Sequence, residues 1–377
     1  KPKIRFKGYT DDWEQRKLNE IADKVSEKNK NNEFSEPFTN SAEQGIISQK
    51  DYFDREIVND ENLNGYYIVR NDDFIYNPRI SVTAPVGPIN RNRLGRNGVI
   101  SPLYTVFRTH DIDNLYLEFY FKTTKWHRFM KLNGDSGARF DRFTISSTQF
   151  MEMPIPYPTL EEQRKIGAYF ESLATLITLH QRKCEETKKL KKYMLQKMFP
   201  QNGQTVPEIR FAGFTDAWEQ RKLGEIFKEY SEKGHTELPT LTIIQGAGTV
   251  KREDSDRNLM YDEANLSNYK MVRKDDFIVH LRSFEGGLEK ASLNGIISPA
   301  YHTFHSDEAD SRFYYPYFRS FEFIKHKLVP HVYGIRDGRS IDIEGMKCIE
   351  IPYTSLSEQR ENGDYLELLD HIITLHQ

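Results

Sequence analysis

With 377 residues, the chain is long enough for two domains that each bury a core of their own. A hydrophobic share of 37%, a mean hydropathy of −0.71 and the lack of any apolar run near the roughly 18 residues of a membrane span predict no transmembrane helix. The net charge of −3 excludes a chain that is basic throughout, so any nucleic-acid-binding surface must be local.

The cysteine content indicates the compartment. Two cysteines, Cys184 and Cys348, are too few for a disulfide framework, and this usage favours a reducing environment. No segment has the pattern of a signal peptide. We therefore expect a cytoplasmic protein.

In chain order, the first informative stretch is residues 4–21, IRFKGYTDDWEQRKLNEI, which returns at residues 209–226 as IRFAGFTDAWEQRKLGEI. Fourteen of the eighteen positions are identical, which indicates that one unit was duplicated. Each of these two stretches holds one tryptophan, Trp13 or Trp218. An aromatic residue followed by Leu and Ile at helix or strand spacing is more often buried than exposed, so we predict that both belong to the core.

Short strands come next in each copy. Tyr and Val runs punctuated by Asn-Asp, Asn-Gly and Pro predict strands at residues 66–69, 74–76, 99–101 and 104–108. Residues 113–132 then predict a helix whose apolar side comprises Leu115, Phe119, Trp126, Phe129 and Met130, with a counterpart at 313–328. Each unit is therefore predicted to be a mixed α/β domain.

The basic residues concentrate on the loops between these elements. Arginines cluster in residues 90–96 and 137–142 of the first copy and in 334–339 of the second. Arginine can bind two acceptors of guanine and its charge releases counterions from phosphate, and a glutamine amide can pair with adenine. For any single residue the alternative is a solvated loop side chain, so the DNA-binding interpretation depends on the similar pattern in the two copies. The candidate DNA-binding residues are Gln44, Asn77, Arg79, Arg91, Arg93, Arg96, Arg139, Arg142, Gln245, His280, Arg282, Arg336 and Arg339.

A long helix is predicted at residues 159–199. Thr159 and Glu162 form the pattern of a capping box, and Pro200 marks the other end. Steps of four and three residues define a narrow seam that would pack on a partner helix. The seam includes Ile166, Phe170, Leu173, Ile177, His180, Cys184, Thr187, Lys191, Met194 and Met198.

The partner helix lies later in the chain. An Ile-Pro-Tyr segment, a Glu-Gln-Arg segment and a Leu-His-Gln segment all recur 196 residues further on, with Ser355 and Glu358 repeating the capping box. The second helix ends at Gln377, before the counterpart of residues 188–197, so it is expected to be truncated. The seams of the two helices can pack on one another.

Several catalytic functions are disfavoured by the motifs. The segment Asn77-Pro78-Arg79 departs from the Asn-Pro-Pro-aromatic loop of amino-methyltransferases, and no Gly-rich cofactor loop precedes it. Glu186-Thr187-Lys188 is expected on a helix surface rather than at a nuclease site. His180 and Cys184 could supply half a zinc site, but no second pair accompanies them. Without a Walker loop either, we predict a chain that has no catalytic residues and binds no metal.

The whole chain resembles the specificity subunit of type I restriction-modification systems. The resemblance is carried by tandem units that open on a Trp-Glu-x-x-Lys-Leu-like segment and close on Ile-Pro to Glu-Gln-Arg before a long helix. It implies an α+β fold with two target-recognition domains and an antiparallel coiled coil. The implied boundaries are domain 1 at 1–158, spacer helix 1 at 159–199, domain 2 at 200–354 and the start of spacer helix 2 at 355–377.

The resemblance also implies a function and partners. Each domain would read one half of a split site in double-stranded DNA, and the coiled coil would set the unread spacer. Two methyltransferase subunits carrying S-adenosylmethionine would methylate adenine, and ATP- and Mg²⁺-dependent restriction subunits would translocate and cut, with no membrane involved. The alternative is a scaffold protein that holds partner subunits and reads no DNA, which the near-neutral charge favours slightly and the arginine-rich, diverged loops disfavour.

Overall fold

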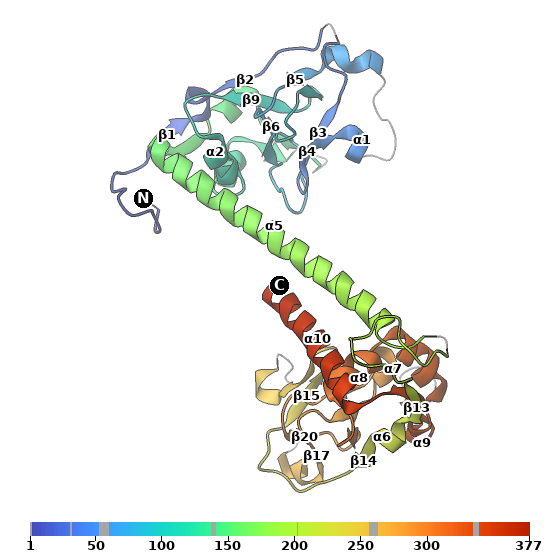
Figure 1. Cartoon of the computed structure of the whole chain (residues 1–377). Helices are drawn as coiled ribbons and strands as arrows, with labels where there is room; N and C mark the ends of the chain where they lie inside the picture. The colour runs from blue at the N-terminus through green and yellow to red at the C-terminus, as the bar shows by residue number, and fades with distance from the viewer. Residues whose placement is uncertain are drawn as a thin grey trace. The chain divides into compact units, whose positions relative to one another are not determined.

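The computed structural model describes residues 2–30, 32–52, 60–136, 141–201, 203–255, 263–334 and 339–377 (Figure 1). Its contacts divide the chain into two units, Lys1–Ile177 and Thr178–Gln377, which we call unit 1 and unit 2. None of the helices in the described ranges is both long and apolar enough to cross a membrane.

A four-stranded antiparallel sheet forms the centre of unit 1. Its strands follow the order β2-β9-β6-β7, comprising Ala22–Lys24, Thr105–Thr109, Phe74–Tyr76 and Ile89–Arg91. Neighbouring residues on one strand point to opposite faces, so Phe74 and Phe107 pack on the helical side while Ile75 and Val106 pack on the other. The sheet is therefore buried on both faces.

Short strand pairs surround this sheet in unit 1 (Figure 1). The pairs are β3 (Phe38–Ser41) with β4 (Gly45–Ser48), β5 (Tyr67–Val69) with β8 (Gly98–Ile100), β10 (Asp135–Ser136) with β11 (Phe143–Thr144), and β1 (Glu14–Lys17) with β12 (Pro154–Tyr157). The four strands expected from the sequence correspond to β5, β6, β8 and β9, each shifted by no more than one residue at either end. Short helices α1 (Gln49–Tyr52) and α4 (Ser147–Met151) complete the unit.

Unit 2 repeats this topology. Its central sheet has the order β14-β21-β18-β19, comprising Lys228–Tyr230, His302–His305, Phe277–Val279 and Glu289–Lys290. The other strand pairs are β15 (Leu241–Ile244) with β16 (Gly248–Lys251), β17 (Lys270–Val272) with β20 (Gly295–Ile297), β22 (Val332–Tyr333) with β23 (Ser340–Ile341), and β13 (Glu219–Lys222) with β24 (Glu350–Tyr353). The helices are α6 (Leu223–Ile226), α7 (Ser283–Gly286), α8 (Ser311–Phe318) and α9 (Ile343–Lys347).

The prediction of a single helix at 113–132 is wrong, because the structure has two helices there. Helix α2 (Asn114–Phe121) ends before α3 (His127–Asn133), and the buried Trp126 folds back so that its indole Nε1 donates to the carbonyl oxygen of Phe121, 3.0 Å away. That bond satisfies a carbonyl that the ended helix leaves free. In unit 2, α8 is likewise separate from a π-helical segment, Glu322–Leu328.

The nearly identical opening segments of the two copies each pair with a strand that lies late in the same unit. In unit 1, β1 pairs with β12, so the opening segment lies against the Ile-Pro-Tyr segment. Arg16 stacks 3.9 Å from the ring centroid of Tyr157. Unit 2 repeats the pairing with β13 and β24, and Arg221 lies 4.4 Å from the ring of Tyr353. This repetition explains why these two stretches of sequence remain alike.

The same segments also bind the first turn of the long helix that follows. Helix α5 spans Leu160–Lys197, and the hydroxyl of Thr159 accepts a bond from the backbone N–H of Glu162 at 3.3 Å, as the capping-box pattern predicts. The carboxylate of Glu162 binds elsewhere. It is fully buried and accepts from Arg5 Nε at 2.6 Å and from Trp13 Nε1 at 3.2 Å.

In unit 2, the C-terminal part of α5 packs antiparallel to α10 (Leu356–Leu375). His180 lies 2.7 Å from His376 between Nδ1 atoms, the Sγ of the buried Cys184 faces the carbonyl of Ile373, and Lys191 binds Asp370 at 2.5 Å. Residue numbers rise on one helix as they fall on the other, which is the antiparallel coiled coil that the seam predicts.

The seam residues differ in their surroundings along α5. Ile166 packs against the core of unit 1, and Phe170 contacts Phe119, whereas Leu173 and Ile177 are 36% and 57% exposed. Met194 is half-buried in unit 2. Beyond the helix, Phe199 stacks on Phe313 and Tyr317 and lies edge-on against Trp218. Trp218 is consequently 2% exposed, while Trp13 is only half-buried.

Candidate nucleic-acid interface

An exposed glutamine occupies the same place in both units, at the tip of a short hairpin. Gln44 lies in the turn between β3 and β4, and Gln245 in the turn between β15 and β16. Each is followed by a glycine with positive φ, 72° at Gly45 and 93° at Gly246, which lets the backbone turn tightly. Both glutamines therefore lie at tight hairpin tips.

In unit 1 the hairpin is fastened to the central sheet by amide groups. The buried Asn40 donates from Nδ2 to the carbonyl of Ile75 at 2.7 Å and accepts at Oδ1 from Asn90 at 2.7 Å. Asn77, the next residue after β6, donates to the Asn40 carbonyl at 2.8 Å. The predicted site residue Asn77 therefore supports the hairpin through its amide nitrogen.

In unit 2 a carboxylate fastens the hairpin to the central sheet. Glu289 is fully buried and stands opposite Ile278 in the sheet, as Asn90 stands opposite Ile75. It accepts from the backbone N–H groups of Gly246 at 2.8 Å and Gly248 at 3.1 Å, and its charge is balanced by Arg319. Residues at equivalent positions of the two sheets thus hold the two hairpins, through an amide in unit 1 and a carboxylate in unit 2.

The turn after the second central strand is built alike in the two units. In unit 1, Asn77 Oδ1 accepts from the backbone N–H of Arg79 at 3.0 Å, and in unit 2, His280 Nδ1 accepts from that of Arg282 at 3.3 Å. A side chain that accepts from the N–H two residues later closes a tight turn. Burial lowers the pKa of His280, which favours the neutral ring that this contact requires. In both turns the arginine is exposed.

A second exposed arginine accompanies each turn. Arg142 directly precedes β11 and stands opposite Arg79 in an antiparallel bridge. Arg339 directly precedes β23, and its guanidinium lies 5.0 Å from the ring centroid of Phe284 in α7, the helix that begins beside Arg282. Within the described ranges, Arg79, Arg142 and Arg282 form no ion pair, so their charges face solvent.

All three arginines of the run at 90–96 are held in ion pairs. Arg91 binds Glu118 and Asp72 at 2.9 and 3.1 Å. Arg93 binds Glu118 at 2.8 Å and both carboxylate oxygens of Glu171 in α5. Arg96 binds both oxygens of Glu36 at 2.7 Å and lowers the pKa of that carboxyl. These contacts fasten β7 and its loop to the rest of unit 1.

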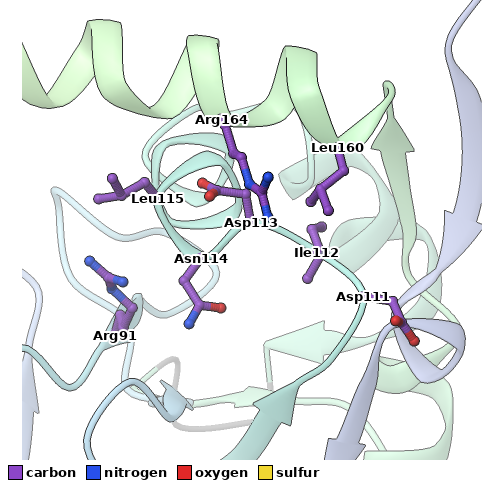
Figure 2. A pocket seen from close by; sticks show the side chains of 8 residues that line it. All are labelled: Arg91, Asp111, Ile112, Asp113, Asn114, Leu115, Leu160 and Arg164. Carbon is purple, nitrogen blue, oxygen red and sulfur yellow. The ribbon is translucent and has the colours of Figure 1, made fainter.

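Figure 2 shows the pocket beside this run, with a volume of about 470 Å³. Arg91 lies at one side of it, and Leu160 and Arg164 reach down from α5 toward the start of α2. Asp113 accepts from the N–H of Tyr116 at 2.9 Å and thereby caps α2. The pocket is a junction between α2 and α5 in which Arg91 and Asp113 serve the fold, and we assign no ligand to it.

Two predicted candidates, Arg139 and Arg336, lie outside the described residues. The sequence reading missed Asn40, Asn90 and Glu289, because their role depends on strand register rather than on local pattern. It also missed Arg5 and Arg210, although the near-identity of residues 4–21 and 209–226 was a signal that could have revealed them.

Comparison with known proteins gives a consistent result. A family model described as the type I restriction modification DNA specificity domain matches residues 10–189. The chain is 24% identical over 356 residues to the type I restriction enzyme MjaVIII specificity subunit of Methanocaldococcus jannaschii, covering 84% of this chain and 82% of that protein. It is 23% identical over 240 residues to the putative type I restriction enzyme MjaX specificity subunit of the same organism, covering 62% of this chain and 56% of that protein.

A solved structure shares the fold. The S subunit of a type I restriction-modification system from M. genitalium superposes with a TM-score of 0.56 at 14% identity, covering 100% of this chain and 93% of that one. The α+β architecture of duplicated units with long helices is therefore common to both chains.

Proposed function

We propose that this chain, which belongs to the DNA specificity subunits of type I restriction-modification systems, reads a DNA site in two separate halves, one with each unit. One observation supports the proposal above the others. The two units share one strand order and present a glutamine-tipped hairpin and an arginine-bearing turn at equivalent positions. The residues around those positions differ, as with Asn90 and Glu289 or Asn77 and His280. Equal scaffolds with different surfaces suit two readers of different sequences.

The proposed contacts divide into two kinds. The exposed amides of Gln44 and Gln245 are suited to base edges, because an amide can pair bidentately with adenine in the major groove. The exposed arginines of the turns can bind phosphate or guanine. Arg91, Arg93 and Arg96 contribute indirectly, by holding the loop in which they lie.

The chemistry is proposed to belong to other subunits. We infer that two methyltransferase subunits bring S-adenosylmethionine and methylate adenine, and that restriction subunits bring ATP- and Mg²⁺-dependent translocation and cleavage. This chain then selects the site without catalysing a reaction. The scaffold alternative is less favoured, since the matching family model describes a DNA specificity domain.

We infer that the long helices set the unread gap between the half-sites. Helix α5 has 38 residues, and at 1.5 Å per residue it spans about 57 Å. Four residues inserted between Ile177 and Thr178, before the residues that contact α10, would lengthen it by about 6 Å. The preferred gap should then grow by one or two base pairs, given a rise of about 3.4 Å per base pair. An unchanged gap would show that the helix is not the spacer.

Methylome sequencing tests the proposed function directly. Cells that express this chain with its methyltransferase subunits should carry methylated adenines in a motif of two short halves separated by a gap of fixed length. Cells that express the methyltransferase subunits alone provide the control and should lack the motif. A continuous motif, or methylation that does not depend on this chain, would contradict bipartite reading.

A further inference from the structure

The arginine pair of unit 1 has an arrangement that costs energy in the isolated protein. Ile80 N–H donates to the carbonyl of Asp141 at 3.0 Å, and Phe143 N–H donates to that of Pro78 at 2.7 Å. These bonds flank Arg79 and Arg142, which are therefore a non-hydrogen-bonded antiparallel pair, the type with the closest side chains and a Cα separation of about 4.5 Å. Like charges directly opposite one another destabilise a strand pair.

Neither arginine of that pair is neutralised in the described part of the chain. Their surroundings contrast with those of the run at 90–96, where each guanidinium has a carboxylate partner within 3.1 Å. Acidic side chains are as abundant as basic ones in this protein, with 56 against 53, so a shortage of partners does not explain the difference. An anionic ligand could supply the counter-charge that the described residues do not.

Unit 2 repeats the placement. Arg282 follows β18 as Arg79 follows β6, and both backbone N–H groups bind the side chain two residues earlier. Arg339 precedes β23 as Arg142 precedes β11. Arg339 stacks over Phe284, two residues beyond Arg282, so the second arginine again lies beside the turn that carries the first.

We propose that Arg79 with Arg142, and Arg282 with Arg339, are two equivalent clamps for the phosphate backbone of DNA, one clamp in each unit. The inference rests on the proposed function and assigns its sequence-independent contacts. Phosphate fits better than a base edge because its formal negative charge offsets the positive charges of an arginine pair, whereas a base edge is neutral. The backbone bridge fixes the spacing of the first pair before DNA arrives, which lowers the ordering cost of binding.

Salt dependence of binding provides the test. The full chain, assembled with its methyltransferase subunits, is titrated onto a 40-base-pair duplex of arbitrary sequence and onto a duplex that carries its methylation motif, over a range of KCl concentrations. Arg79→Gln and Arg142→Gln should each weaken binding to both duplexes about five- to tenfold near 0.1 M salt and reduce the slope of log K against log[KCl] by about 1. The double variant should reduce the slope by about 2.

Thermal stability separates this role from a structural one. Because each substitution removes a like-charge contact, the melting temperature of Arg79→Gln and Arg142→Gln should be unchanged or higher than that of the parent chain. Arg93→Gln should show the opposite pattern, with a lower melting temperature and an unchanged salt slope, since it breaks bonds to Glu118 and Glu171. Arg128→Gln, which removes an exposed charge from α3, controls for net charge and should change neither quantity.

Three outcomes would overturn the inference. An unchanged slope in the double variant would show that the pair does not contact phosphate. A loss confined to the motif duplex, with altered sequence preference, would assign the pair to base reading. A lower melting temperature with intact binding would make the pair structural. If the parent complex binds neither duplex, the proposed function fails as well, whereas parent binding with unaffected variants removes this inference alone.

Discussion

Arg210 holds the buried carboxylate of Glu358 through two hydrogen bonds, 2.6 Å from Nε and 2.8 Å from Nη2. The indole of Trp218 adds a third bond to the same carboxylate at 3.1 Å. Unit 1 has the same arrangement in Arg5, Glu162 and Trp13. In each unit, a residue of the opening segment is thereby fastened to the first turn of a long helix, α5 in unit 1 and α10 in unit 2.

Breaking one of these contacts should destabilise one unit only. Glu358→Gln leaves the guanidinium of Arg210, which is 11% exposed, without its counter-charge, and loss of one partner of a buried pair costs about 3–5 kcal/mol. Amide hydrogen exchange should accelerate in β13 and β24 of this variant and stay unchanged in β1 and β12. Glu162→Gln is the matched control and should show the reverse distribution. Equally accelerated hydrogen exchange in both units would show that the two arginine–glutamate contacts do not act independently.

The two units should differ in their response to pH at one equivalent position. In unit 1 the buried Asp73 binds Arg108 at 2.7 and 2.8 Å, and in unit 2 the buried Asp276 binds His305 at 2.5 Å. Burial acts to lower the pKa of His305, but its bonds to Asp276 and Asp307 outweigh burial and raise the pKa above its usual value. The charged imidazole is thus favoured in the folded state.

The sign of the pH effect follows from linkage. A folded-state pKa above the unfolded value near 6.5 means that the pair contributes fully below about pH 6.5 and that this stability is lost as pH rises through the folded pKa. Thermal unfolding of unit 2 should therefore shift to lower temperature above neutral pH. His305→Arg should remove this shift, and Arg108→His should introduce it into unit 1. A wild-type melting temperature that rises over the same interval would refute the assignment.

Two glycines inside the long helices give a prediction that opposes helix propensity. Alanine normally favours a helix over glycine by about 0.5–1 kcal/mol. A Cβ at Gly167, however, would lie 2.8 Å from Leu115 Cβ and 3.0 Å from the backbone nitrogen of Tyr116. At Gly363, its counterpart in α10, the nearest atom, Arg312 Cβ, is 3.1 Å away and the nearest backbone atom 3.3 Å.

We therefore expect different outcomes at the two positions. Gly167→Ala should destabilise unit 1 by about 1–3 kcal/mol, because a contact of 2.8 Å to Leu115 Cβ forces packed atoms of α2 to move. Gly363→Ala should be close to neutral, since a shift of a few tenths of an ångström relieves the contact. Urea unfolding of the two variants measures both values. Stabilisation by Gly167→Ala would mean that α2 and α5 are packed more loosely than the distances indicate.

The sequence predicted the elements whose signals are local. The short strands β5, β6, β8 and β9 are bounded by Gly, Pro and Asn-Asp segments, and the seam of α5 has helical periodicity, so both could be recognised without coordinates. The division of the 113–132 helix could not, because it depends on the indole of Trp126 returning to Phe121. Likewise, Glu162 stands at the position of a capping-box residue, but its carboxylate binds Arg5, which lies 157 positions earlier in the sequence.

The candidate site shows the same limit. A run of three arginines in seven residues indicates a DNA contact, yet the carboxylates that occupy them come from Glu36, Glu118 and Glu171, which are distant in sequence. The isolated Arg79 and Arg282 gave weaker local signals, yet they form no ion pair within the described ranges. Only the fold shows which cations already have partners.

A graft between the two units tests the central claim most directly. Residues 18–155 replace residues 223–351, so that both exchanged segments begin with Leu after Glu-Gln-Arg-Lys and end with Ile before Pro-Tyr. The graft retains the contact between Arg210 and Glu358. Recovery of the assembled complex with an unchanged melting profile controls for folding. Methylome sequencing should then report a motif in which both halves are the half-site that unit 1 reads in the parent chain. Retention of the parent motif, or alteration of the half that unit 1 reads, would contradict one reader per unit.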